Sequence, residues 1–141
     1  RTTILRFGVV LGKDGGALEK MLPAFRAYMG GIIGNGLMMM SWIDIDDLVR
    51  IYRFVLEQKL EGIYNASAPK PVTNFYFTRA LGKALKRPTW LPLPSFIIKM
   101  LFSEGAVVLL DSKEAHPKAL LDKGFVFTYP TVESSLAKIL A

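Results

Sequence analysis

Residues 46–66 read DDLVRIYRFVLEQKLEGIYNA and combine a helix pattern with a strand pattern. The helix pattern opens on Asp46 and Asp47, because acidic side chains are favoured at the positive N-terminal end of a helix. Its apolar residues share one predicted stripe: Leu48, Tyr52, Val55 and Leu56. Gly62 follows the last turn and opens a short strand to Ala66. A helix leading directly into a strand is typical of an α/β fold.

A strand and a helix precede this unit. Residues 2–11 form a β-branched run closed by Gly12, which predicts a buried strand leading into a loop. From Ala17 the apolar residues recur at helical spacing up to Gly30, and they are Leu18, Met21, Leu22, Phe25, Tyr28 and Met29. Pro23 lies inside that pattern and predicts either a kink or the start of the main helix.

The glycine-rich residues 30–36 predict a loop over a cleft, and residues 38–45 predict a short strand anchored by Trp42. Thr73 is a predicted N-cap of a helix that Pro88 ends. The residues of that helix expected to face inward are Phe77, Leu81, Ala84 and Leu85.

The residue composition changes at Pro88, where a proline-rich stretch is followed by apolar runs. We therefore predict two parts: residues 1–88 with the strands, and a mainly helical domain over residues 89–141. A short helix is expected over residues 117–123, and Thr131 is expected to cap a last helix. That last helix buries Val132, Leu136, Ile139 and Leu140 in this interpretation.

Strand, helix, strand and helix over residues 2–87 predict an α/β fold with a parallel sheet. Two strands are too few to stand alone, because a parallel pair leaves its edges and faces uncovered. We therefore expect the rest of the sheet to come from sequence outside these 141 residues.

The composition narrows the classes of protein. A hydrophobic fraction of 51% excludes a disordered chain, and no run of 18 uninterrupted apolar residues predicts a membrane span. Without such a span, no membrane is expected as a partner. The net charge of +6 is scattered along the chain without a nucleic-acid motif, so no nucleic acid is expected as a partner either. The absence of cysteine fits a reducing compartment, and a cytoplasmic location is expected.

Four motifs, in this order, resemble a known family. They are RFGVVLG at residues 6–12, SWIDIDD at 41–47, YNASAP at 64–69 followed by PVTN at 71–74, and GFVFTYP at 124–130. The chain is similar to the atypical extended short-chain dehydrogenase/reductases that are labelled nucleoside-diphosphate-sugar epimerases. The stretch beyond Pro88 resembles the C-terminal domain of unknown function attached to that family.

The resemblance implies a C-terminal fragment of a Rossmann-like enzyme, carrying its last parallel strands and its substrate-side helices. Such a full-length protein would use NAD or NADP to move a hydride to or from a carbinol carbon. The sequence holds neither the G-x-x-G-x-x-G turn nor the Tyr-x-x-x-Lys pair of the superfamily. We therefore expect the fragment alone to bind no cofactor and to be inactive, with no catalytic residue of its own.

By resemblance, four residues at the end of the first strand would bind the cofactor: Phe7, Gly8, Val9 and Val10. A small Gly8 would let the backbone approach the nicotinamide ring. The alternative is that a strand end needs glycine only for packing, and residue types do not decide between the two.

Five residues would line the substrate cleft by the same resemblance: Gly12, Lys13, Gly34, Met40 and Trp42. A tryptophan in a short strand is more often part of the core, so that alternative stays open for Trp42. Related enzymes often carry arginine where this chain has Met40 and histidine where it has Asp44. Without that guanidinium a diphosphate clamp is missing, so the substrate need not be a nucleotide sugar.

No metal site is predicted, because Asp44, Asp46 and Asp47 are better explained as helix-capping residues. Arg79, Lys83, Lys86 and Arg87 form a basic stripe, most simply a solvated helix face and alternatively a phosphate site.

The expected partners are the missing N-terminal dinucleotide-binding half and a small-molecule substrate, with a homodimer as a further expectation. Two alternatives remain, a self-contained interaction or dimerisation module and a non-catalytic epimerase relative.

Overall fold

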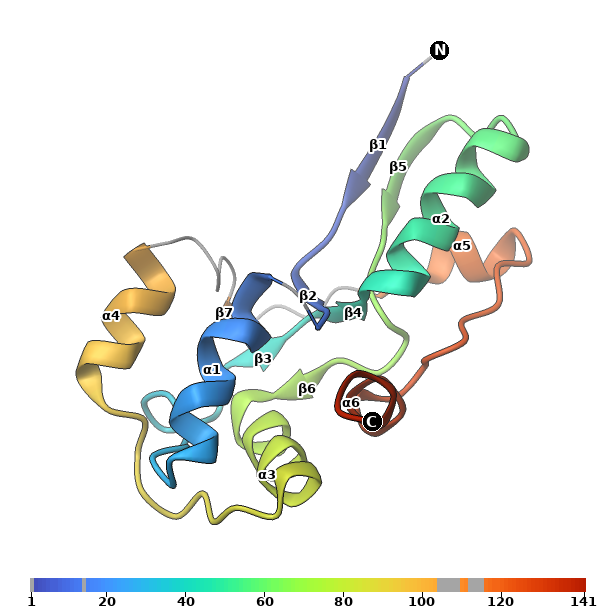
Figure 1. Ribbon diagram of the computed structural model, residues 1–141. Helices are drawn as coiled ribbons and strands as arrows, with labels where there is room; N and C mark the ends of the chain where they lie inside the picture. Colours follow the sequence, from blue (N-terminus) through green and yellow to red (C-terminus); the bar gives the residue numbers. More distant parts are fainter. Residues whose placement is uncertain (1, 14, 104–109, 112–115) are drawn as a thin grey trace.

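The computed structural model describes residues 2–13, 15–103, 110–111 and 116–141. Its elements follow the order β1 (Thr3–Arg6), β2 (Val9–Leu11), α1 (Gly16–Arg26), β3 (Met39–Met40), β4 (Trp42–Asp44), α2 (Ile45–Glu57), β5 (Gly62–Asn65), β6 (Val72–Thr73), α3 (Asn74–Leu85), α4 (Ser95–Ser103), β7 (Leu110–Asp111), α5 (Lys118–Asp122) and α6 (Val132–Ile139). In Figure 1, β1, β5, α2 and α5 form one end of the molecule, and α1, α3, α4 and α6 gather at the other.

The predicted parallel sheet is confirmed. β1 and β5 run parallel, with Thr3 opposite Gly62 and Arg6 opposite Asn65. Leu5 and Tyr64 lie opposite each other, and both pack with the buried side of α2. Side chains alternate between the two faces of a strand, so α2 covers one face of this sheet.

Two predicted strands are each broken into two. The run 2–11 divides into β1 and β2 at Phe7 and Gly8, and the run 38–45 divides into β3 and β4 at Ser41. The two breaks meet, because Val9 N donates a hydrogen bond of 2.9 Å to the Ser41 carbonyl. β2 then pairs in parallel with β4, while β3 pairs antiparallel with both β6 and β7. The chain thus changes from one sheet to the next at this crossing.

Helix α1 differs from its prediction at both ends. It begins at Gly16, so the alternative that the helix starts at Pro23 is wrong. It ends at Arg26, and Tyr28 and Met29 lie beyond it with exposed side chains. Tyr28 adopts a φ of 65°, a left-handed conformation that is incompatible with continuing the helix.

Helix α2 begins at Ile45, one residue before its predicted start, and buries only part of the predicted stripe. Asp44 is its N-cap and accepts a hydrogen bond of 2.8 Å from Asp46 N. Tyr52 and Leu56 were expected inside, yet their side chains are 46% and 76% exposed. The buried apolar positions are Leu48, Ile51 and Val55. The helix turns this narrower face to its sheet and leaves the neighbouring positions uncovered.

The N-caps of α3 and α6, and most of their buried residues, agree with the sequence prediction. Thr73 caps α3 as predicted, and Phe77 and Leu81 are buried. Ala84 is exposed instead of buried, while Gly82 is buried at a position where a Cβ would lie 2.4 Å from Thr89 Cγ2. Thr131 caps α6 through a reciprocal capping box with Ser134. The buried side of α6 carries Val132, Leu136 and Ile139 as predicted, with Leu140 half-buried.

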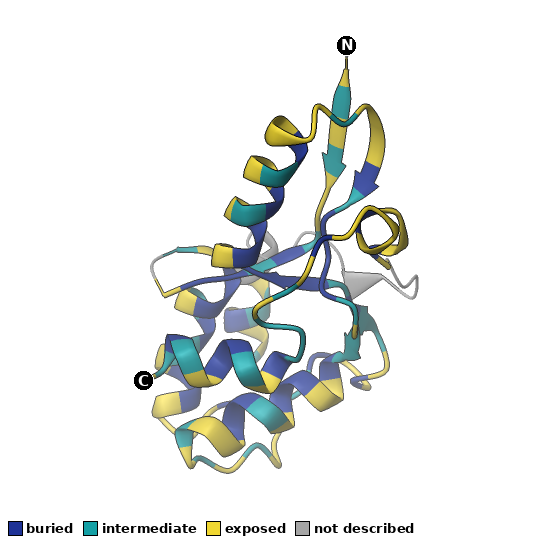
Figure 2. Cartoon of the chain, turned by 90° about the vertical axis from the view of Figure 1, so that its right-hand side faces the viewer, coloured by how far each residue is buried: buried dark blue, intermediate teal, exposed yellow. Residues whose placement is uncertain are grey.

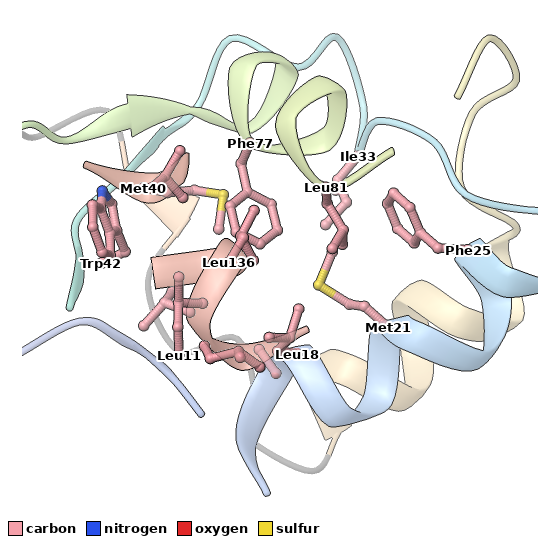
Figure 3. Packing of buried hydrophobic residues seen from close by; sticks show 14 of the residues in the cluster. Leu11, Leu18, Met21, Phe25, Ile33, Met40, Trp42, Phe77, Leu81 and Leu136 are labelled. Atoms are coloured by element: carbon pink, nitrogen blue, oxygen red, sulfur yellow. The ribbon is translucent and has the colours of Figure 1, made fainter. Parts of the chain in front are cut away.

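The described residues bury two apolar clusters. The larger lies among the helices at one end of the molecule, where Figure 3 shows Met21 near Leu81 and Leu136 near Phe77. It takes residues from both the 1–88 and the 89–141 segments. The smaller lies between α2, β5 and α5, and Phe125 contacts Phe54 edge to face at 5.4 Å. Figure 2 shows the buried positions on the facing sides of the helices and the exposed ones outside.

Candidate functional site

The carboxyl end of the β1–β5 sheet is the first candidate site. In open α/β sheets, ligands bind in the crevice beyond the carboxyl ends of parallel strands. β1 and β5 end in register, and Ala66 N donates a hydrogen bond of 2.7 Å to the Arg6 carbonyl. Phe7 follows immediately, with a side chain that is 44% exposed. An exposed aromatic ring therefore stands where a cofactor or substrate would reach this sheet.

The other residues predicted to bind the cofactor are less accessible. Val9 is buried in the larger cluster, and Val10 packs against the smaller one. A Cβ on Gly8 would lie 2.1 Å from the Ser41 carbonyl oxygen, so glycine is required by the backbone crossing. This contact favours the packing explanation for Gly8. Cofactor contact by these four residues stays a prediction.

A hollow of about 370 Å³ lies beyond the end of β2 and is the second candidate site. Two of the predicted substrate residues, Gly12 and the exposed Lys13, line it. The remaining lining comes from the start of α2 and from the C-terminal helix: Ile45, Asp46, Lys138, Ile139 and Ala141. Cationic and anionic side chains face the same hollow, so a small polar molecule is the ligand class that suits it.

The other predicted substrate residues do not reach this hollow. Gly34 is exposed in the loop between α1 and β3, with a φ of 59°. Met40 and Trp42 are 2% and 0% exposed and belong to the larger core (Figure 3). Trp42 Nε1 donates a hydrogen bond of 2.9 Å to the Lys70 carbonyl, which satisfies its one polar group. The structure thus favours the core alternative for Trp42, and substrate contact stays untested.

Lys138 is a polar centre that sequence reasoning missed. Its Nζ lies 2.9 Å from Asp44 Oδ1 and 2.9 Å from Asp46 Oδ2, and 4.6 Å from the centre of the Tyr129 ring. Burial by itself lowers the pKa of the Lys138 ammonium, but the hydrogen bonds and charges of the two carboxylates outweigh burial and raise that pKa. Ser135 Oγ also donates to Asp44, at 2.5 Å. Lys138 therefore holds α6 to the start of α2.

Asp47 is the second polar residue with an unpredicted role. Its carboxylate is fully buried and accepts hydrogen bonds from Thr128 N at 3.0 Å and Tyr129 N at 2.8 Å. Arg50 completes the arrangement with an ion pair of 2.9 Å to the same carboxylate. The acidic pair at the start of α2 predicted capping alone, because partners about eighty residues later in the chain leave no local signal.

No group of three or more histidine, cysteine or acidic side chains in the described parts of the chain is placed to hold a metal ion. Among the described helices, none has the length and apolar character needed to cross a membrane.

Comparison with known proteins gives a consistent result. Residues 93–139 match the model of a domain of unknown function, DUF1731. The chain is 43% identical over 141 residues to the chloroplastic epimerase family protein SDR39U1 homologue of Arabidopsis thaliana, covering 99% of the chain and 41% of that protein. The crystal structure of human epimerase family protein SDR39U1 with NADPH aligns with a TM-score of 0.85 and 34% identity, over 99% of this chain and 48% of that one.

This chain is homologous to the epimerase family proteins. A nucleoside-diphosphate sugar epimerase from Corynebacterium glutamicum also aligns, with a TM-score of 0.68 and 28% identity over 98% of this chain and 26% of that one. The chain spans about half the length, or less, of the epimerase family proteins that it matches. Its α/β fold is that of a Rossmann-like epimerase in part.

The DUF1731 match over residues 93–139 includes α4, α5 and α6. Of these, α6 packs on α3 and is held by Asp44. Contacts of α6 thus join the DUF1731 segment to the strand-bearing part of this chain.

Proposed function

We propose that this chain is the substrate-side part of an NAD(P)-dependent epimerase or oxidoreductase and is inactive by itself. A nicotinamide cofactor would exchange a hydride between its C4 atom and a carbinol carbon of the substrate. These 141 residues contain neither the turn that cradles the pyrophosphate nor the Tyr-x-x-x-Lys pair. The observation that carries the proposal is the incomplete sheet formed by β1 and β5.

One face of that sheet is bare. Ile4 and Ile63 lie opposite each other in register, on the face away from Leu5 and Tyr64, and they are 48% and 53% exposed. Parallel sheets in α/β proteins are covered by helices on both faces. Within the described residues, α2 covers the other face only. A helix from a preceding segment would bury this isoleucine pair.

The edge of β1 is also open. Among the described strands, β1 pairs with β5 alone, so its second edge has backbone groups without a neighbouring strand. Beside it, Thr3, Leu5, Tyr52, Val55 and Leu56 line an apolar-floored hollow of about 320 Å³. A further parallel strand beside β1 would cover this hollow together with the exposed Tyr52 and Leu56. The occupant we propose is the dinucleotide-binding half of the longer protein.

The residues present fit a cofactor in part. Phe7 stands exposed at the carboxyl end of β1, where a flat ring could pack against it. Gly8 offers no open cradle, because the Ser41 carbonyl occupies the space beside it. In this arrangement the chain orients substrate and shields the reacting atoms from water, while Gly12 and Lys13 contact the substrate. A cytoplasmic location and a nucleotide-sugar substrate are part of the same proposal.

Calorimetry with NADPH tests the proposal on two proteins. The 141-residue chain alone should show no saturable binding, and a longer protein in which a dinucleotide-binding half precedes this chain should bind. In the longer protein, Ile63→Asp should weaken NADPH binding, because it places a charge under the docked half. Val126→Asp is the matched control, since Val126 is 71% exposed in the loop after α5. Saturable binding by the short chain would contradict the proposal.

A further inference from the structure

Two loops run side by side at the end of the molecule opposite β1 (Figure 1). The segment after α1 contacts the segment between α3 and α4. Leu93 N donates a hydrogen bond of 2.9 Å to the Ile32 carbonyl, and Gly31 packs against the backbone of Leu91. Arg87 Nε donates a hydrogen bond of 3.2 Å to the Arg26 carbonyl. These contacts hold the two loops together as one surface.

Large apolar side chains project from this surface. Trp90 is 83% exposed, Leu91 60% and Tyr28 59%. Met29 and, in the first turn of α4, Phe96 are exposed as well. The neighbouring Leu93 and Ile97 are buried in the larger core, so the surface adjoins that core. Such a gathering of exposed aromatic and aliphatic side chains marks an interaction site.

The same surface is basic. Arg26, Lys86 and Lys99 are exposed, and the Arg87 guanidinium lies 4.8 Å from the centre of the Tyr28 ring. The sequence has no acidic residue from Lys20 to Ile43, nor from Gly62 to Ser103. We call these four basic residues, with Tyr28, Met29, Trp90, Leu91 and Phe96, the basic aromatic patch.

We propose that the basic aromatic patch binds the surface of an anionic lipid bilayer. Tryptophan and tyrosine favour the membrane–water interface, and lysine and arginine are attracted to anionic headgroups. Leu91 and Phe96 would enter the outer acyl region while the basic side chains contact phosphate and carboxylate groups. This peripheral contact needs no membrane-spanning helix, and the sequence prediction that excluded a membrane considered only a span.

Charge disfavours a second copy as the occupant. A symmetric dimer would place the patch against itself, so Arg26, Lys86 and Lys99 would face the same cations. A nucleic acid would satisfy the charges, but its phosphate backbone offers no apolar phase for Trp90 and Leu91. A dinucleotide-binding half docked on β1 would lie at the other end of the molecule in Figure 1.

Vesicle flotation of the 141-residue chain tests this surface. The probes are vesicles of phosphatidylcholine containing about 30 mol % phosphatidylserine and vesicles of phosphatidylcholine alone. The chain should float with the anionic vesicles only, and salt should weaken the binding. Tryptophan emission should shift to shorter wavelength on binding, and the shift reports on Trp90 because Trp42 is 0% exposed.

Variants separate the apolar from the charged contribution. Trp90→Ala with Leu91→Ala should lower the apparent affinity about tenfold or more. Leu56→Ala, which removes a leucine that is 76% exposed on α2, should leave it unchanged. Lys99→Glu should lower it about fivefold or more for anionic vesicles, and Lys123→Glu, at the exposed residue that follows α5, is the matched charge control with a smaller effect.

Thermal melting should show that each of these exposed substitutions leaves the fold intact. The proposal is wrong if the chain binds neither kind of vesicle, or binds neutral and anionic vesicles equally. It is also wrong if Trp90→Ala with Leu91→Ala abolishes an oligonucleotide complex or a soluble dimer and leaves vesicle binding unchanged.

Discussion

At the scale of single residues, several positions have structural roles that the neighbouring sequence does not predict. Gly8 is needed because another backbone segment passes against it, and Trp42 fills the core with its indole N–H satisfied. The carboxylate of Asp47 is fully buried, and a buried charge destabilises the fold unless hydrogen-bond donors or a cation compensate for the lost water. In each case the partner comes from a distant part of the chain.

Substitution of Gly8 by alanine should destabilise the chain by about 1–3 kcal/mol, because the added Cβ would meet the Ser41 carbonyl and force the crossing apart. The free energy of unfolding in urea measures this loss. Gly34→Asn is the control, since nothing lies near Gly34 and asparagine tolerates its left-handed backbone. Equal stability of Gly8→Ala and the unmodified chain would show that the β1–β2 break is flexible enough to admit a side chain.

The substitution Asp47→Asn should cost about 2–4 kcal/mol, because one backbone N–H of the C-terminal segment loses its acceptor and Arg50 loses its ion pair. Asp46→Asn provides a matched comparison one residue earlier, where the side chain is 61% exposed and the ion pair contributes less than about 1 kcal/mol. Urea unfolding and amide exchange at Thr128 and Tyr129 measure the difference. Similar losses for the two variants would contradict the role assigned to Asp47.

At the scale of elements, helix positions were more predictable than helix faces. The sequence predicts the N-caps Thr73 and Thr131 and the acidic start of α2, and the structure agrees. Capping is predictable because it is a local interaction between a side chain and the next turn. The buried stripe of α2 was partly wrong at Tyr52 and Leu56. A periodic pattern shows which side chains are apolar, but the neighbours that are present decide which of them are covered.

The attachment of α6 to α2 should weaken in alkali. The pKa of Lys138 is raised above its ordinary value of 10.5, so its contribution is complete below that pH and is lost as the pH rises through the higher folded value. Lys138→Met should therefore be less stable than the unmodified chain near neutral pH, and the gap should close in strong alkali. Melting temperatures of both proteins between pH 8 and about pH 12 measure it. A gap of constant size would mean that the ammonium does not hold α6.

At the scale of the whole molecule, the described residues cover the helical end more completely than the β1–β5 sheet. The larger core joins α1, α3, α4 and α6, whereas among the described strands β1 pairs with β5 alone, and Ile4 and Ile63 are exposed on one face of that sheet. The epimerase family proteins that the chain matches are twice its length or more. The proposed function depends on which protein segment covers the β1–β5 sheet.

The isolated chain should self-associate as its concentration rises, because an open strand edge pairs readily with another copy. Ile4→Lys together with Ile63→Lys should shift it to monomer by placing charges on the bare face. Sedimentation velocity measures the change, with Val126→Lys as a control at another exposed position. A strictly monomeric chain at all concentrations would show that the edge is protected.

The sequence by itself determined the α/β class with a parallel sheet, the helix caps and the resemblance to the epimerase family proteins, since these follow from local propensity, periodicity and motif order. Only the tertiary structure decided that two predicted strands break at Gly8 and Ser41, that Tyr52 and Leu56 are exposed, and that Asp47 holds a distant segment. These outcomes depend on contacts between residues far apart in the chain, and no local pattern encodes such contacts.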